Sequence, residues 1–129
     1  MQAKLHNFTA KATVGHVDPP ALVTVAKAIG DLDELVRLFA NGLSRSKPWQ
    51  VHLAVHIAEA DRLMQVLRLT VALDRPKAEI VEAATDLQMA CRRARLSLAG
   101  TRADRTAVAA LQLATELAAA IVHGLRHTP

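Results

Sequence analysis

Apolar residues recur at alternating steps of three and four in four consecutive segments of this 129-residue chain. That spacing gathers side chains on one face of a helix, so each segment is predicted to form an amphipathic α-helix. Aromatic residues make up only 2% of the chain, which disfavours a β-sandwich or barrel. The first three stripes are Leu22, Val25, Ile29, Leu32, Val36 and Phe39; Leu53, Ile57, Ala60, Met64, Leu67 and Val71; and Ile80, Ala84, Leu87, Cys91, Ala94 and Leu98.

Proline and glycine mark the boundaries of these helices. An acidic residue followed by proline is a typical helix start, and glycine is a typical helix end. Thr101 and Asp104 resemble a capping box ahead of the last helix. The predicted helices are 19–41, 48–73, one that opens at 74–76 and closes at Gly100, and one that ends near Leu125.

The connections between these helices are short, so consecutive helices must run in opposite directions. We therefore predict an all-α fold, an antiparallel up-down-up-down four-helix bundle over residues 18–129. Residues 1–17 lack helical periodicity, although apolar and polar residues alternate from Phe8 to Val14. They form an irregular N-terminal arm, which is either a partly ordered tail or an extended segment that packs on a partner subunit.

The cysteine content and the distribution of apolar residues indicate the cellular compartment. The single cysteine, Cys91, cannot form an internal disulfide, and its place on the third stripe predicts a buried, unreactive thiol. The N-terminus has no apolar segment of signal-peptide length, so we expect a cytoplasmic protein. The apolar run from Ala107 to Val122 is interrupted by polar residues and is shorter than the ~20 residues of a membrane span. Arginine greatly outnumbers lysine and alanine is abundant, a bias common in GC-rich bacterial genomes, which favours a bacterial or phage origin.

Two helices carry more apolar surface than one core face requires. The second helix adds Val51, Val55, Val66, Leu69 and Leu73 to its stripe. The last helix carries Ala107, Ala110, Ala114, Leu117 and Ile121, and also Val108, Leu111, Ala118, Val122 and Leu125. A helix that is apolar around most of its circumference must be buried on most sides, so we expect a homo-oligomer that uses one of these helices.

Two pairs of histidines stand four residues apart, His52 with His56 and His123 with His127. Each pair shares a helix face, but in the predicted topology the two pairs are roughly 27 Å apart and cannot hold one metal ion. His52, His56 and Glu59 lie on one side of the second helix and are the candidate metal ligands. The alternative, which we favour, is structural histidines with hydrogen-bonded nitrogens.

Basic residues gather around two of the predicted connections. In an up-down bundle the first and third connections lie at the same end, so these residues would form an anion-attracting surface. The alternative is that the arginines late in the third helix simply complement its dipole. The candidate polyanion-binding residues are Arg45, Lys47, Arg92, Arg93, Arg95, Arg102 and Arg105.

The chain contains no nucleophile elbow, phosphate-binding loop or zinc-finger spacing, and no cofactor is expected. We therefore expect a non-enzymatic helical interaction protein, an adaptor, regulator or chaperone-like partner of another protein. The alternatives are nucleic-acid or polyanion binding through the basic residues and a metal-dependent helical-bundle enzyme.

Overall fold

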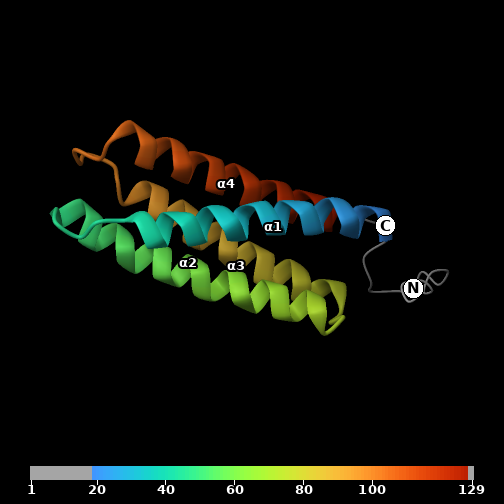
Figure 1. The fold of residues 1–129 in the computed structure, drawn as a ribbon. Helices are drawn as coiled ribbons and strands as arrows, with labels where there is room; N and C mark the ends of the chain where they lie inside the picture. The colour runs from blue at the N-terminus through green and yellow to red at the C-terminus, as the bar shows by residue number, and fades with distance from the viewer. Residues whose placement is uncertain (1–18, 128–129) are drawn as a thin grey trace.

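The structure, a computed structural model, describes residues 19–127, and within this range the chain forms four α-helices and no strand (Figure 1). The helices are α1 (Pro19–Gly42), α2 (Pro48–Ala72), α3 (Lys77–Leu96) and α4 (Arg105–Arg126). The all-helical fold predicted from the sequence is confirmed. The predicted N-terminal arm, residues 1–17, lies outside the described residues.

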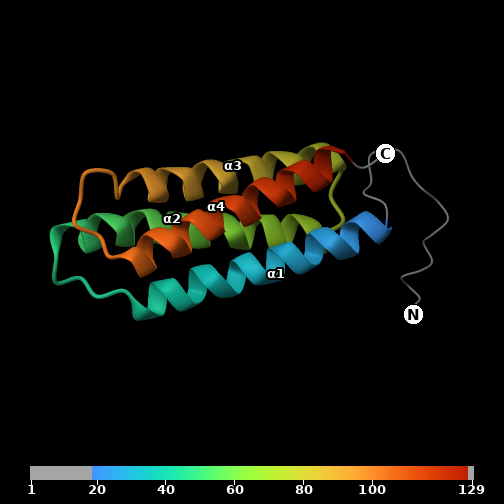
Figure 2. The same ribbon diagram turned by 90° about the horizontal axis from the view of Figure 1, so that it is seen from above.

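Each helix packs against two neighbours, which is the arrangement of a bundle. α1 contacts α2 and α4, and α3 contacts the same two helices from the opposite side. In both views the α1–α2 and α3–α4 connections lie at one end of the molecule, and the α2–α3 connection lies at the other end (Figures 1 and 2).

The predicted stripes form the core. From Val25 onward, every residue of the three stripes is buried except Phe39 and Val71, which are partly buried and pack against the buried cluster. Both exceptions stand at the end of their helix, where fewer neighbours cover a side chain. The side chains with almost no exposed surface are Leu32, Leu53, Met64, Leu67, Leu87, Cys91, Leu111, Ile121 and Leu125.

The connection between α2 and α3 differs from the prediction. Asp74 was expected to open the third helix, but it lies in the turn that follows α2, with φ of +54°. α3 begins only at Lys77, after Pro76. Aspartate tolerates left-handed backbone better than most residues, so it can reverse the chain at this point.

The connection between α3 and α4 is also longer than predicted. α3 ends at Leu96, and Gly100 lies in the turn beyond it with φ of +74°. Thr101 does not cap α4, because its hydroxyl donates a hydrogen bond to the Leu98 carbonyl at 2.7 Å. Asp104 is the N-cap, since its carboxylate accepts a hydrogen bond from the Ala107 N–H at 2.8 Å.

Candidate functional site

The end of the bundle that carries the α1–α2 and α3–α4 connections is the first candidate site, and we call it the basic end (Figure 2). All seven predicted polyanion-binding residues are exposed. Within the described part of the chain, none of the seven forms an ion pair with an acidic side chain. Asp104, the acidic residue of these two connections, uses its carboxylate to cap α4. Apart from Asp104, the two connections contain no acidic residue that could offset this positive charge.

An open pocket of about 490 Å³ lies between the start of α2 and the α3–α4 connection. It brings together two of the predicted basic residues, Lys47 and Arg102, and adds His52. The pocket wall is completed by Pro48, Trp49, Ser97 and Thr101. Two cations, an imidazole and an apolar wall make this pocket suitable for a small anionic group.

Trp49 forms part of that wall and is a residue that sequence reasoning missed. The side chain is buried, and its indole Nε1 has no hydrogen-bond partner among the described residues. Trp49 also lines a second open pocket of about 290 Å³, which lies between the end of α1 and the starts of α2 and α4. The only signal in the sequence is that this single tryptophan directly follows a helix-opening proline.

Arg93 does not belong to the pocket at the basic end. It lines a groove between α2 and α3 together with Glu59, Arg62, Asp86 and Met89. Its positive charge adds to that of Arg62 in lowering the pKa of Glu59, although the hydrogen bond from Arg62 is the larger cause. Arg93 therefore acts on a different surface from Lys47 and Arg102.

The three candidate metal ligands on α2 do not form a common site: Glu59 is hydrogen-bonded to an arginine, and the two histidines differ in exposure. The Glu59 carboxylate accepts two hydrogen bonds from Arg62, at 3.0 Å and 2.8 Å. His52 is exposed in the pocket wall, whereas His56 is half-buried. Within the described residues, no three His, Cys, Asp or Glu side chains come together as metal ligands would. Geometry thus adds no support to a site formed by His52, His56 and Glu59.

The second pair of histidines lies at the end of α4. The rings of His123 and His127 stack with their centroids 4.1 Å apart, and a nitrogen of His127 lies 3.0 Å from the His123 carbonyl oxygen. This ring therefore interacts with one of the last carbonyls of the helix, as is typical of a C-terminal histidine.

The outer surface of α2 is the second candidate site. Val51, Val55, Val66, Leu69 and Leu73 are all exposed, with exposed fractions between 41% and 66%. These are the residues that the sequence assigned to a second apolar stripe on this helix. The bundle leaves that stripe in solvent.

The second apolar stripe of α4 is mostly covered within the bundle. Of its second stripe only Val108 is exposed, while Leu111, Ala118, Val122 and Leu125 are buried. α4 packs against α1 and α3, so the two neighbours cover both stripes. α2 is therefore the helix whose extra apolar surface remains unexplained by the monomer.

From the sequence, the apolar run Ala107 to Val122 was predicted to be too short for a membrane span. The helix that contains it, α4, is longer than this run. Among the described helices, it is the one that is long and apolar enough to cross a membrane, judged by length and composition alone. A core helix of a soluble protein meets the same criteria. In the bundle, the side chains of Leu111, Ile121 and Leu125 of α4 are buried.

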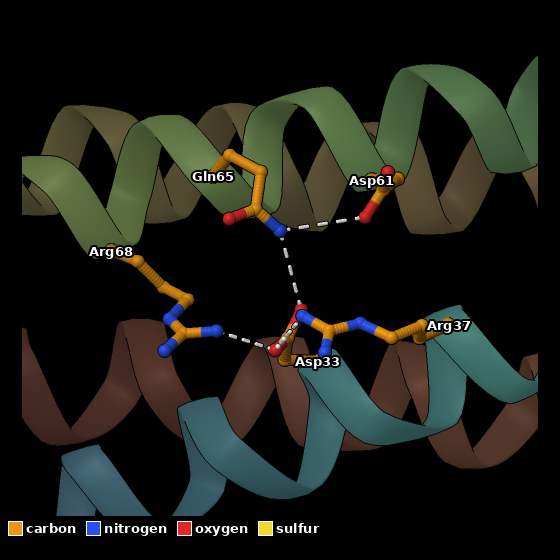
Figure 3. Close-up of polar contacts among 5 residues, drawn as sticks. All are labelled: Asp33, Arg37, Asp61, Gln65 and Arg68. Atoms are coloured by element: carbon orange, nitrogen blue, oxygen red, sulfur yellow. Dashed lines mark hydrogen bonds and ion pairs between the residues drawn. The ribbon is translucent and has the colours of Figure 1, made fainter.

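The third feature is a polar cluster between α1 and α2 (Figure 3). Asp33 is the one buried charged residue among the described side chains. Its Oδ2 accepts hydrogen bonds from Arg37 of α1 at 2.8 Å and from Arg68 of α2 at 2.5 Å. Gln65 lies 3.4 Å from the other carboxylate oxygen and 3.5 Å from Asp61. Sequence reasoning missed this cluster, because its partners are more than thirty residues apart.

Comparison with known proteins gives no further guide: no family model, characterised protein or solved structure matches the chain. The candidate sites therefore depend on their geometry alone.

Proposed function

We propose that this protein is a non-enzymatic helical interaction module that self-associates through the outer surface of α2. The single observation that carries the proposal is the row of five exposed Val and Leu side chains, four on α2 and the fifth, Leu73, at its C-cap. Burial of apolar surface stabilises an association by roughly 25 cal/mol per Å² before the costs of association are subtracted. No other helix of the described bundle exposes as many large apolar side chains.

We further infer that the four helices run up-down-up-down. The short connections and their placement at alternate ends support this topology (Figures 1 and 2). In such a bundle α2 keeps one side for the core and leaves the opposite side for a partner.

Light scattering tests self-association. We expect the wild-type protein at ~100 μM to have at least twice the monomer mass, and we expect Leu69→Glu to lower this mass because it places a charge in the interface. A matched control is Val23→Glu on α1, whose side chain is 70% exposed and lies outside the proposed surface. Far-ultraviolet circular dichroism checks that each variant stays helical. A monomeric wild-type protein at ~100 μM would contradict the proposal.

A second candidate function is weak binding of nucleic acid or another polyanion at the basic end. It is favoured by six exposed basic side chains that form no ion pairs within residues 19–127, namely Arg45, Lys47, Arg92, Arg95, Arg102 and Arg105. Binding that releases counterions should weaken steeply as salt is raised. With 2% aromatic residues, the chain offers few side chains on which bases could stack, so little sequence preference is expected.

Titration of fluorescent DNA and RNA at two salt concentrations tests this second function. We expect the triple variant Arg92→Glu, Arg95→Glu, Arg105→Glu to lose binding. The control Arg126→Glu, which changes a basic residue at the other end of α4, should bind nearly as the wild type does. Absence of wild-type binding at low salt, or equal binding by the triple variant, would exclude the polyanion function.

A further inference from the structure

The apolar residues on the outer surface of α2 are placed symmetrically about one residue in the sequence. Arg62 stands at its centre, and apolar residues occur 4, 7 and 11 positions away from it in both directions. Before Arg62 these positions hold Ala58, Val55 and Val51, and after it they hold Val66, Leu69 and Leu73. All seven residues are exposed, and we call them the α2 outer stripe.

The α2 outer stripe is straight and long. At 100° per residue its seven positions fall within an arc of about 80°, and the 22 steps from the first position to the last span about 33 Å along the helix axis. A helix with this face can pack along its whole length against a second helix with the same face. The pattern of apolar residues is unchanged when the helix direction is reversed.

We propose that a second copy of this chain packs on the α2 outer stripe in antiparallel orientation, with the two-fold axis at Arg62. This inference rests on the self-association proposed above and specifies its geometry. It places Val51 against the partner's Leu73 and Val55 against the partner's Leu69. Ala58 lies against the partner's Val66, so the same three contacts occur twice in the dimer.

Side-chain size favours this orientation over a parallel one. The half of the stripe before Arg62 carries smaller residues, Val51, Val55 and Ala58, and the half after it carries two leucines. Antiparallel packing sets each small side chain against a larger one, which keeps the distance between the helices even. Parallel packing would set alanine against alanine and leucine against leucine, and the resulting gap would lose packing contacts.

Charge favours the same orientation. The start of α2 lies at the basic end, so parallel packing would place the basic ends of both copies side by side. Antiparallel packing separates them by the length of the bundle and also opposes the two α2 dipoles.

The positive charge of Arg62, at the centre of the stripe, is neutralised within the same helix. Arg62 is held by the carboxylate of Glu59, one helical turn away, and this pair raises the pKa of Arg62 and lowers that of Glu59. At the two-fold axis the two arginines would meet, and each would be paired with Glu59 of its own helix, which offsets the repulsion between them. A group of this kind sets the register of two helices as well as their orientation.

Cysteine cross-linking tests the orientation directly. The native Cys91 is buried, and burial raises its pKa to about 11, so wild-type protein should form no disulfide-linked dimer. Under oxidising conditions we expect Arg62→Cys to cross-link to itself. Val55→Cys alone and Leu69→Cys alone should not, because identical positions would be about 21 Å apart. An equal mixture of these two variants should cross-link, and Val23→Cys on α1 is the control for random collision.

The possible results separate the two proposals. Self-linking of Val55→Cys would show parallel packing and overturn this inference while leaving self-association intact. A dimeric mass without any cross-link in Arg62→Cys or in the mixture would overturn it as well. A monomeric wild-type mass in light scattering would instead refute the self-association on which the inference rests.

Discussion

Removing the partners of Asp33 should destabilise the fold, and removing Asp33 as well should restore much of the loss. The Asp33 side chain is only 8% exposed, and its carboxylate is held by Arg37 and Arg68 from two different helices (Figure 3). The arginine side chains themselves are 59% and 51% exposed. An arginine freed from the pair can therefore return to water, whereas a freed Asp33 cannot.

The magnitudes follow from this asymmetry. A hydrogen bond to a charged group contributes about 1.5–3 kcal/mol, and exposure of the arginines reduces this to about 1–2 kcal/mol for Arg37→Ala or Arg68→Ala alone. The double variant leaves Asp33 with only the 3.4 Å contact to Gln65. It should cost about 3–5 kcal/mol, more than the sum of the single changes, because a buried charge is then left uncompensated. Adding Asp33→Leu should bring stability back to within about 1 kcal/mol of the wild type.

Urea unfolding followed by circular dichroism measures all five proteins, and equal slopes against denaturant show that the comparison is valid. The decisive result is the gain in stability when the third substitution is added to the double variant. If the triple variant is no more stable than the double variant, Asp33 is not a buried charge that depends on its two arginines.

Three further outcomes are expected. Leu87→Ala and Ile57→Ala should each lower the free energy of unfolding by roughly 2–5 kcal/mol in urea, because both side chains are buried in the core; a loss below ~1 kcal/mol would contradict this. Burial raises the pKa of Cys91 from 9.0 to about 11, so the unfolded chain loses this proton first, and stability should fall by about 2 kcal/mol as the pH rises from 9 to 11. Cys91→Ala should lack this component of the pH dependence. His52→Ala with His56→Ala should leave the metal content unchanged, and stoichiometric zinc or iron that is lost in this variant would support the metal-site hypothesis.

The sequence alone determined the helices and their inner faces. Leu53, Ile57 and Leu67 are buried as their spacing predicts, because a helix fixes which side chains share a face whatever it packs against. The ends of the helices were less well determined. An acidic residue before proline reads as a helix start, yet Asp74 instead forms the left-handed turn that follows α2. Local sequence permits both roles, and the reversal of the chain selects one.

Tertiary structure decided which of the extra apolar faces would remain exposed. α2 and α4 both carry a second stripe, but Leu111 and Leu125 of α4 are buried while Leu69 and Leu73 of α2 are exposed. The symmetry of the α2 outer stripe about Arg62 is present in the sequence. It supports an interface only when that face is exposed, and exposure is set by the packing of the bundle. Likewise, the pairing of Asp33 with Arg68 joins residues 35 positions apart. Periodicity orients a side chain about its own helix axis, whereas burial depends on where the neighbouring helices lie, and only the packed bundle fixes that.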